Sequence, residues 1–362
     1  MENQKTVFVG VSGGVDSSVS AALLKDQGYK VVGVFIRTWQ PDFIECTWRD
    51  ERRDAMRVCA HLDIPFLECD GEEAYKKGVA DYMISEYKLG RTPNPDVMCN
   101  REVKFGVFWN FAKSQGVDFI ATGHYAQNIN NKLVKGNDES KDQSYFLWTL
   151  NSDDLDHTLF PIGHLPKTEV RKLALKYKLP TAVKKDSQGV CFLGPLDMKD
   201  FLSHYIEPQN GDVLNVDGEV IGYHDGAVFF TLGERHGFTI TVKGVNDEPY
   251  YVISKDINKN TIIVSNNPCL SEEGAGGGDS NKEYTLINSN IQNVSVIENK
   301  KPAYRTGRYT AQIRYHGEFL NCVLATVGSN IKVIFDNSIL VSPGQSIVIY
   351  DNNVCLGGGI VQ

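Results

Sequence analysis

The sequence predicts an α/β domain with a parallel sheet, then a small β-rich central domain and a C-terminal antiparallel β-barrel. Three observations predict this order. Residues 1–200 alternate strand-like and helix-like segments, and short β-rich runs replace them from about Asn210. The stretch Glu272–Lys282, E-E-G-A-G-G-G-D-S-N-K, has the composition of a flexible linker. The expected boundaries are 1–205 for the α/β domain, 206–271 for the central domain, 272–283 for the linker and 284–362 for the barrel.

The first 36 residues predict a nucleotide site. Val7–Val11 has the length and β-branching of a buried strand, and Val31–Ile36 is apolar on both faces, as in a parallel sheet covered by helices. Between them the chain turns at Ser12–Gly14, and a helical pattern runs from Ser17 to about Gln27. Glycines let backbone N–H groups approach phosphate oxygens, and a helix N-terminus favours negative charge.

The turn sequence S-G-G-V-D-S-S at 12–18 matches neither the Walker motif nor G-x-G-x-x-G. It resembles the PP-loop of ATP pyrophosphatases, Rossmann-like enzymes that cleave ATP between the α and β phosphates. This resemblance implies that Ser12, Ser17 and backbone amides hold pyrophosphate and that Asp16 meets Mg²⁺. The alternative is an ordinary glycine turn that caps a helix.

Composition narrows the class of protein. With 41% hydrophobic and 23% charged residues, the chain is typical of a globular protein with an ample core. No apolar run approaches the length of a membrane span, so no membrane partner is expected. The N-terminus lacks the pattern of a signal peptide, and the eight cysteines include no C-x-x-C, which argues against a zinc cluster or a secreted disulfide framework. We therefore expect a cytoplasmic protein.

A net charge of −8 argues against a surface covered with phosphate contacts, but one local stretch is basic. Between Lys300 and Gly317 there are five lysine or arginine residues and no acid, with three tyrosines among them. This mixture suits phosphate and stacking contacts with RNA. A solvated strand face with aromatic core residues is the alternative, and composition alone leaves both open.

The middle of the α/β domain contains one unusual loop. Helical patterns at Asp50–Leu62 and Glu72–Leu89 flank a strand at Ile64–Cys69. The loop Gly90–Asn100, G-R-T-P-N-P-D-V-M-C-N, then has two prolines that forbid helix and stiffen the approach to Cys99. A rigid loop that presents an acid and a thiol together is more than a connection needs.

Four later segments extend the domain. A strand at Phe119–Thr122 ends at Gly123-His124, on the side of the sheet where such folds bind ligands, although His124 would equally suit a hydrogen-bonded loop position. Helical stretches follow at Lys141–Phe146 and Thr168–Tyr177. The loop Lys184–Gly194 then places Cys191 after two lysines, whose charge lowers the pKa of a thiol from roughly 8.5.

The β-rich half is expected to contain ten strands. They are Asp212–Val216, Glu219–Tyr223, Val228–Leu232, Tyr250–Ser254 and Thr261–Ser265 in the central domain, and Tyr309–Tyr315, Leu320–Val327, Lys332–Phe335, Ser346–Tyr350 and Cys355–Val361 in the barrel.

Taken together, the motifs resemble those of the tRNA-specific 2-thiouridylases over nearly the whole chain. The motifs that carry this resemblance are S-G-G-V-D-S-S (12–18), G-R-T-P-N-P-D-V-M-C-N (90–100), A-T-G-H-Y-A (121–126), K-D-Q-S-Y-F-L (141–147), K-K-D-S-Q-G-V-C-F-L-G (184–194), S-P-G-Q-S-I-V-I-Y-D (342–351) and C-L-G-G-G (355–359). The two cysteine motifs at this separation, with P-G-Q-S near the C-terminus, make the resemblance specific.

The resemblance implies an ATP-dependent sulfurtransferase that replaces O2 of wobble uridine 34 with sulfur in tRNAs, among them those for Lys, Glu and Gln. ATP, with Mg²⁺, adenylates the C2 oxygen and pyrophosphate leaves. A cysteine persulfide then supplies the sulfur, giving 2-thiouridine and AMP. The sulfur is expected to come from a persulfide-donor protein of a sulfur relay or from a cysteine desulfurase.

The resemblance also implies roles for individual residues. Cys191 would carry the persulfide and Cys99 would be the second catalytic thiol, so a Cys99–Cys191 disulfide and a mobile loop are expected during turnover. The implied contacts are Gly10, Val11, Ser12, Gly13, Gly14, Val15, Asp16, Ser17, Ile36 and Gly123 with ATP; Asn94, Pro95 and Asp96 with the flipped-out target base; and His124, Lys141, Asp142, Gln143, Arg314, Tyr315 and Gln345 with tRNA.

Two positions depart from the family pattern. Ile36 stands where the family often has Met, and Glu234 replaces Gln in a T-x-G-Q-R-x-G motif, which puts a polar role of the central domain in doubt. Two other functions remain as alternatives. One is a PP-loop amidating synthetase acting on a small molecule, and the other is a non-enzymatic, nucleotide-responsive RNA-binding protein. Both would make the two cysteines spectators.

Overall fold

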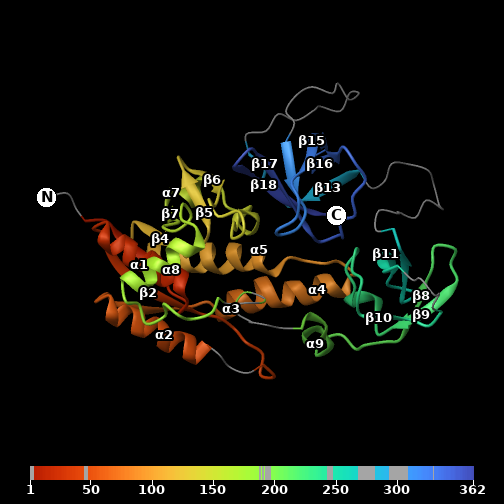
Figure 1. The fold of residues 1–362 in the computed structure, drawn as a ribbon, viewed down its shortest axis with the longest axis horizontal. Helices are drawn as coiled ribbons and strands as arrows, with labels where there is room; N and C mark the ends of the chain where they lie inside the picture. The colour runs from red at the N-terminus through yellow and green to blue at the C-terminus, as the bar shows by residue number, and fades with distance from the viewer. Residues whose placement is uncertain are drawn as a thin grey trace. The chain divides into compact units, whose positions relative to one another are not determined.

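The computed structural model describes residues 4–44, 48–186, 189, 191, 197–242, 248–267, 282–292, 309–328 and 330–362. Cys46, Cys269, the linker up to residue 281 and most of the basic stretch, 300–308, lie outside the described residues. The chain forms two compact units (Figure 1). Unit 1 comprises Met1–Asp81, Pro95–Pro195 and Tyr350–Gly357, and unit 2 comprises Tyr82–Asn94, Leu196–Ile349 and Gly358–Gln362.

Unit 1 is built on the expected parallel sheet, with strand order β3-β2-β1-β4-β7. Its strands are β1 (Thr6–Gly10), β2 (Lys30–Arg37), β3 (Phe66–Asp70), β4 (Phe119–Ala121) and β7 (Thr158–Leu159). The order reverses at β1, because β2 pairs with one edge of β1 and β4 with the other. In open α/β sheets, ligands bind at the carboxyl ends of strands beside such a reversal.

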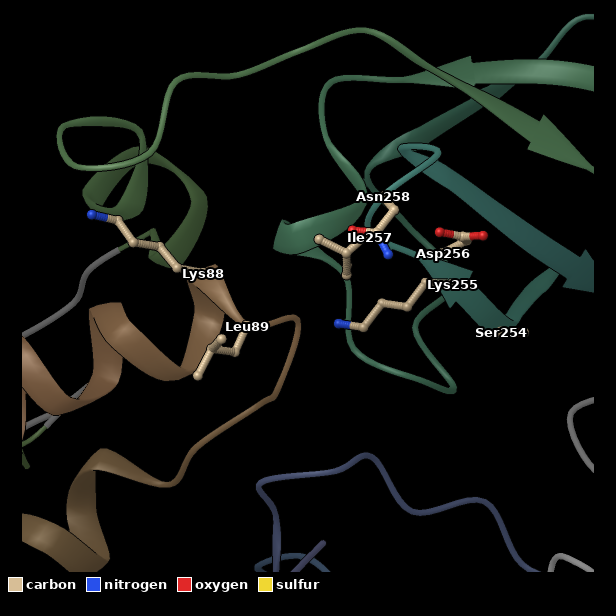
Figure 2. Close-up of a pocket in the computed structure, with 7 residues that line it drawn as sticks. All are labelled: Lys88, Leu89, Ser254, Lys255, Asp256, Ile257 and Asn258. Carbon is tan, nitrogen blue, oxygen red and sulfur yellow. The ribbon is translucent and has the colours of Figure 1, made fainter.

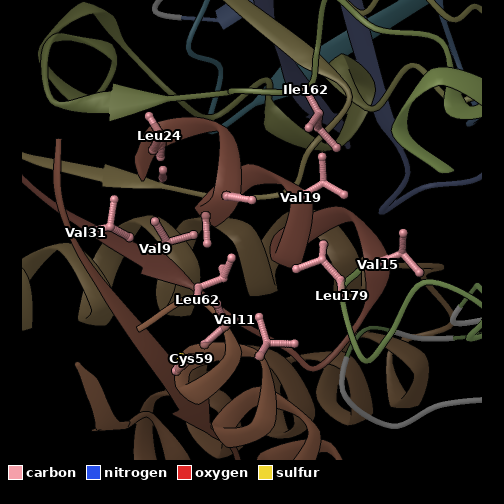
Figure 3. Close-up of a cluster of buried hydrophobic side chains, with 14 of the residues drawn as sticks. Val9, Val11, Val15, Val19, Leu24, Val31, Cys59, Leu62, Ile162 and Leu179 are labelled. Carbon is pink, nitrogen blue, oxygen red and sulfur yellow. The ribbon is translucent and has the colours of Figure 1, made fainter. Parts of the chain in front are cut away.

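Helices cover both faces of this sheet, as strands without polar alternation require. Val7 and Val9 of β1 point into a core shared with α1 (Val15–Asp26), α2 (Trp48–His61) and α8 (Lys167–Lys176), part of which Figure 3 shows. Phe8 points to the other face, where its ring centroid lies 6.0 Å from that of Phe111 in α6 (Phe108–Ser114). The α/β expectation for this part of the chain is confirmed.

The prediction that the proline loop Gly90–Asn100 contains no helix is wrong. Helix α5 (Pro95–Cys99) begins within it and continues through a π-helical segment, Asn100–Val107, into α6. Pro95 occupies the first helical position, where its missing N–H would have no partner inside the helix and its fixed φ suits the helical backbone. The proline therefore starts the helix whose last residue is Cys99.

Other elements differ from expectation in smaller ways. The helix expected from Glu72 is α3 (Glu72–Tyr75), a π-helical segment (Lys76–Asp81) and α4 (Tyr82–Lys88). The helical stretch expected near Lys141 is one 3₁₀ turn, Ser144–Leu147, and a hairpin that the sequence did not predict, β5 (Ala126–Ile129) and β6 (Lys132–Lys135), precedes it. The strand expected at Val228–Leu232 is instead a 3₁₀ turn, Ala227–Phe229.

The two β-rich parts belong mainly to unit 2, although the barrel residues Tyr350–Gly357 belong to unit 1. The central sheet has the order β10-β9-β8-β12-β11, and the barrel β13-β16-β15-β14-β17-β18 is closed by pairing of β13 with β18. The strands are β8 (Gly211–Leu214), β9 (Val220–His224), β10 (Phe238–Ile240), β11 (Tyr251–Asp256), β12 (Thr261–Ser265), β13 (Glu283–Ile287), β14 (Tyr309–Gln312), β15 (Leu320–Val327), β16 (Asn330–Phe335), β17 (Ser346–Asp351) and β18 (Val354–Val361). Among them, β10 and β13 were not predicted.

The remaining described helices are short. They are α7 (Ser152–Asp156), capped by Asn151, and α9 (Met198–Ser203), capped by Asp197. Among the described residues, no helix combines the length and the apolar character that crossing a bilayer requires.

Replacing Gly33 with alanine tests the packing of α2 on β2. A Cβ at this position would overlap Sγ of the buried Cys59, so we expect destabilisation of about 1–3 kcal/mol. Removing that sulfur in the double variant Gly33→Ala/Cys59→Ala should recover part of the loss, and urea unfolding followed by far-UV circular dichroism measures all three variants. Strictly additive effects would contradict the contact.

Candidate active site

The glycine turn forms an open helix N-terminus. Gly13 has a φ of +71°, and a Cβ there would lie 2.5 Å from the carbonyl oxygen of Glu51, so only glycine fits. Gly14 is the N-cap of α1, and no side chain caps it. The hydroxyl of Ser17 instead accepts a hydrogen bond from the backbone N–H of Ser12 (3.3 Å), on the turn itself. These features fit an anion at the start of α1.

The second predicted turn lies directly against this helix. A Cβ on Gly123, which follows β4, would lie 2.7 Å from the backbone nitrogen of Ser17. The backbone after β4 and the first turn of α1 therefore touch, as neighbouring carboxyl ends of parallel strands allow. Ile36 of β2 is buried beside Gly10: its Cδ1 would be 3.9 Å from a Cβ on that glycine. The structure thus brings the residues expected to contact ATP together at the carboxyl ends of β1, β2 and β4.

Asp16 carries the negative charge of this turn and is held by two partners. Lys167 Nζ lies 2.7 Å and 2.8 Å from its two carboxylate oxygens, and the hydroxyl of Tyr125 donates to it over 2.8 Å. Lys167 also pairs with Asp186 at 2.9 Å. Burial raises the pKa of Asp186, but the hydrogen bond and charge of Lys167 outweigh this, so the net pKa is lowered. No group of three or more His, Cys, Asp or Glu side chains that could hold a metal ion occurs among the described residues.

The two predicted catalytic cysteines meet in unit 1. Cys99 Sγ at the end of α5 lies 3.5 Å from Cys191 Sγ, although 92 residues separate them in sequence. Asp96 accepts a hydrogen bond from the backbone N–H of Cys191 (3.0 Å), and the hydroxyl of Tyr75 donates to its carbonyl oxygen (2.7 Å). Asp96 and Cys99 are three residues apart on one helix and so share a face. Both backbone polar groups of Cys191 are therefore fixed by side chains.

The two thiols differ in how easily they ionise. The hydrogen bond from Cys99 is the main cause that lowers the pKa of Cys191; burial opposes it, and the charge of Lys104 lowers the pKa further. Burial, together with the neighbouring Cys191, raises the pKa of Cys99 well above its ordinary value. Of the two thiols, Cys191 is therefore the one that loses its proton more readily.

The positive charge beside Cys191 differs from the sequence expectation, which gave that role to the lysines at 184 and 185. Lys184 Nζ donates to the carbonyl oxygen of Gly13 (3.0 Å) and pairs with Asp54 (2.8 Å), next to the glycine turn. Lys104 is the lysine that contacts the sulfur. Lys104 follows Cys99 by five residues and lies within the π-helical segment. The sequence analysis missed Lys104 because it predicted a loop up to Asn100, in which this spacing has no structural meaning.

His124 lies inside the site and is buried. Its Nδ1 is 2.7 Å from Thr122 Oγ1, and its Nε2 is 3.4 Å from Lys104 Nζ. A lysine ammonium has donors only, so Nε2 accepts and Nδ1 carries the proton. Burial, with the charge of Lys104, lowers the pKa of His124 well below its ordinary value, which keeps the ring neutral.

The other expected tRNA and base contacts are spread along the chain. In unit 1, Lys141 pairs with Asp186 (3.4 Å), Asp142 accepts from the backbone N–H of Gly136 (2.8 Å), and Gln143 accepts from that of Tyr125 (3.0 Å). Pro95 begins α5 in unit 1, whereas Asn94 belongs to unit 2. Also in unit 2, Arg314 and Tyr315 lie in the turn after β14, and Gln345 accepts from the backbone N–H of Ser342 (3.3 Å).

Unit 2 also contains a hollow of 570 Å³ that no predicted site residue lines (Figure 2). Its walls are Lys88, Leu89 and Ser254–Asn258. Burial lowers the pKa of Lys255 to about 8 against the opposing charge of Glu234. Lys255 Nζ donates a hydrogen bond to the carbonyl oxygen of Phe230, so this amine already has a hydrogen-bond partner within the fold.

Three family models match successive parts of the chain. They describe a tRNA methyl transferase HUP domain over residues 5–195, a tRNA methyl transferase PRC-barrel domain over 199–266 and an aminomethyltransferase beta-barrel domain over 288–361.

The chain is similar over its whole length to curated proteins named tRNA-specific 2-thiouridylase MnmA. It is 42% identical over 371 residues to the one from Pseudomonas fluorescens, which covers 99% of this chain and 95% of that protein. It is 43% identical over 374 residues to the one from Oceanobacillus iheyensis, with coverage of 100% and 96%. A solved structure of the U34-tRNA thiolase NcsA from Methanococcus maripaludis is 20% identical, with a TM-score of 0.36, over 56% of this chain and 66% of that one.

Mild oxidation tests whether the two sulfurs meet in solution. Because Cys99 and Cys191 are within van der Waals contact, stoichiometric diamide should join them, and mass spectrometry of non-reduced peptides should find the 99–191 cross-link in most molecules. Cys99→Ser should abolish the cross-link, and Cys59→Ala should preserve it. Recovery of both peptides unlinked from the wild-type protein would contradict the geometry.

Proposed function

The chain belongs to the tRNA-specific 2-thiouridylase family, and on this premise we propose the steps by which it thiolates tRNA. It is a tRNA sulfurtransferase. We propose that it uses ATP to adenylate the C2 oxygen of wobble uridine 34 and then transfers sulfur from a persulfide on Cys191. The observation that carries this proposal is the contact of Cys99 with Cys191 at 3.5 Å, beside a carboxyl group on the same helix as Cys99.

ATP is proposed to bind at the glycine turn. The uncapped start of α1 and the hydroxyls of Ser12 and Ser17 supply donors for the phosphate oxygens that leave as pyrophosphate. Gly10, Ile36 and Gly123 form the apolar and backbone surface nearby. Asp16 is the residue proposed to hold Mg²⁺, since a half-exposed carboxylate is a suitable hard oxygen ligand. When bound, this ion would neutralise charge on the phosphates.

Activation of the base needs a leaving group and a place for one proton. The C2 oxygen attacks the α-phosphorus, the bond to the β-phosphate oxygen breaks, and the uridine loses its N3 proton. Burial raises the pKa of Asp96 despite the hydrogen bond from Cys191 and the charge of Lys104, so its carboxylate is a better base than an exposed one. Asn94, Pro95 and Asp96 are proposed to face the base once it leaves the stack.

Sulfur transfer then uses both thiols. The terminal sulfur of the Cys191 persulfide attacks C2, and AMP departs with the former C2 oxygen. The Cys99 thiol gives up its proton as its sulfur attacks Cys191 Sγ, the bond from Sγ to the transferred sulfur breaks, and the electron pair of that bond stays on the transferred sulfur as the thiocarbonyl. N3 regains a proton, and the protein is left with a Cys99–Cys191 disulfide that an external thiol reductant reopens.

The tRNA is proposed to be held from several places on the chain. Lys141, Asp142 and Gln143 are the proposed contacts of unit 1. His124, which was also expected to touch tRNA, is buried and has both ring nitrogens engaged by Thr122 and Lys104. Arg314, Tyr315 and Gln345 are those of unit 2. We propose tRNAs for Lys, Glu and Gln as substrates. The proposed sulfur source is a persulfide-donor protein or a cysteine desulfurase.

The alternatives explain fewer of these features. An amidating synthetase or a nucleotide-responsive RNA-binding protein would have no use for two thiols in contact with opposite pKa shifts. Methyl transfer, which the descriptions of two matching models name, does not require a persulfide-forming cysteine either. The relatives that match the whole chain are named for thiolation.

Cys191→Ser separates the two half-reactions. We expect formation of 2-thiouridine to fall below detection, because a hydroxyl cannot carry a persulfide, while tRNA-dependent release of pyrophosphate continues. Nucleoside mass spectrometry and a coupled pyrophosphate assay measure the two, with Cys59→Ala as a control that keeps both. Full thiolation by Cys191→Ser would refute the persulfide role.

Asp16→Asn tests the ATP site. Loss of the carboxylate charge should raise the Mg-ATP concentration needed for half-maximal pyrophosphate release by about tenfold or more, as losses around metal sites commonly do. The affinity for tRNA, measured by filter binding, should stay the same. Asp26→Asn, at the exposed far end of the same helix, is the matched control. An unchanged requirement for ATP and Mg²⁺ would exclude Asp16 from this site.

A further inference from the structure

Lys104 is placed where three potential anions of the sulfur site meet. Its ammonium hydrogen-bonds Cys191, and its charge interacts with Cys99 and Asp96. Although burial opposes the charged form, these neighbours raise the pKa of Lys104. The neighbouring acidic groups therefore favour the charged form of Lys104 next to both sulfurs.

The histidine that contacts Lys104 does not neutralise its charge. The neutral ring of His124 accepts a hydrogen bond from Lys104 through Nε2 (3.4 Å) and is itself fixed by Thr122 through Nδ1 (2.7 Å). A neutral imidazole takes one donor of the ammonium without cancelling its charge. The net positive charge thus remains available to Cys191, Cys99 and Asp96.

We propose that Lys104 is a catalytic residue that holds the sulfur of Cys191 as an anion, both as the thiolate that accepts sulfur and as the persulfide that delivers it. The delivery half of this proposal rests on the function proposed above. A thiolate and a terminal persulfide each place one negative charge within reach of the same ammonium. A lysine suits this task because a flexible stem carries a compact charge that can follow the anion from Sγ to the added sulfur.

Loading of Cys191 can be written with all atoms accounted for. The Cys191 thiolate attacks the outer sulfur of a donor persulfide, a sulfur–sulfur bond to Sγ forms, and the donor's own sulfur–sulfur bond breaks. The electron pair leaves with the donor sulfur, which becomes a thiolate. Lys104 stabilises the negative charge on the nucleophile before this step and on the terminal sulfur after it.

The groups that face Cys191 push its pKa in both directions. Cys99 and Lys104 favour the thiolate, whereas Asp96 and burial disfavour it. Tyr75 holds the backbone carbonyl and stays protonated, because burial and the neighbouring thiols and carboxyl raise its pKa. Lys104 is thus the cation that offsets Asp96 among the residues that shift the Cys191 pKa.

Alkylation of the full-length protein tests this role without tRNA or ATP. Iodoacetamide reacts with thiolates, so the rate of modification of the Cys191 peptide at pH 7, followed by mass spectrometry, reports the thiolate fraction. Lys104→Met should slow this rate about tenfold, the change that one unit of pKa produces. Lys104→Arg should keep most of the rate, and Lys113→Met, exposed on α6, should keep all of it. An unchanged rate in folded Lys104→Met would overturn the proposal.

Two further measurements guard against misfolding. Thermal melting checks each variant, and Lys104→Gln replaces Lys104→Met if the latter does not fold. In the wild-type protein, the pH profile of Cys191 alkylation should have its midpoint below the ordinary thiol value of about 8.5, and a midpoint at or above it contradicts the proposal with no variant at all.

The failure of this proposal can be told apart from failure of the proposed function. If wild-type protein with ATP, tRNA and a persulfide donor makes no 2-thiouridine, yet Lys104→Met slows alkylation, the proposed function falls and the thiolate role of Lys104 stands. If thiolation proceeds and Lys104→Met changes neither alkylation nor thiolation, the Lys104 proposal alone falls.

Discussion

The site depends on holding Cys191, which belongs to a loop, against Cys99 at the end of a helix. Ordering a loop costs conformational entropy, and here the side chains of Asp96 and Tyr75 offset that cost by fixing both backbone polar groups of Cys191. The carboxyl group that positions the loop is also the one proposed to act on the base. Asp96 of α5 therefore has two roles: it positions the Cys191 loop, and it is the proposed base for the uridine.

The same loop begins at the glycine turn. Lys184 binds the carbonyl oxygen of Gly13, and Asp186 pairs with Lys167, which in turn holds Asp16. Five residues after Asp186 the chain reaches Cys191. The proposed phosphate site and the paired cysteines are thus connected in sequence by a short segment, whose start is held at the glycine turn by Lys184 and Asp186. Lys184 therefore anchors this segment at the glycine turn. The sequence expectation that Lys184 lowers the pKa of Cys191 was wrong.

Much of the fold follows from local patterns, and the errors have local causes. Buried β-branched runs such as Val7–Val11 predicted the parallel sheet, because strands covered on both faces lack polar residues. The two prolines of the loop Gly90–Asn100 predict a break in the helix, although the first helical position accepts Pro95. Because a loop was expected up to Asn100, the sequence did not indicate that Cys99 and Lys104 lie on one continuous helical segment. The contact of Cys99 with Cys191 was predicted from the family resemblance alone, because no local sequence pattern indicates the distance between residues 92 positions apart.

The most direct test of the sulfur-relay account is a single turnover with isotopically marked sulfur. Protein carrying a ³⁴S-labelled persulfide on Cys191 would be mixed with ATP and unmodified substrate tRNA, and nucleosides and peptides would be analysed together. The account predicts ³⁴S in 2-thiouridine and one Cys99–Cys191 disulfide for each uridine converted. Thiolated tRNA that lacks the label, or that forms while both cysteines remain unlinked, would contradict it.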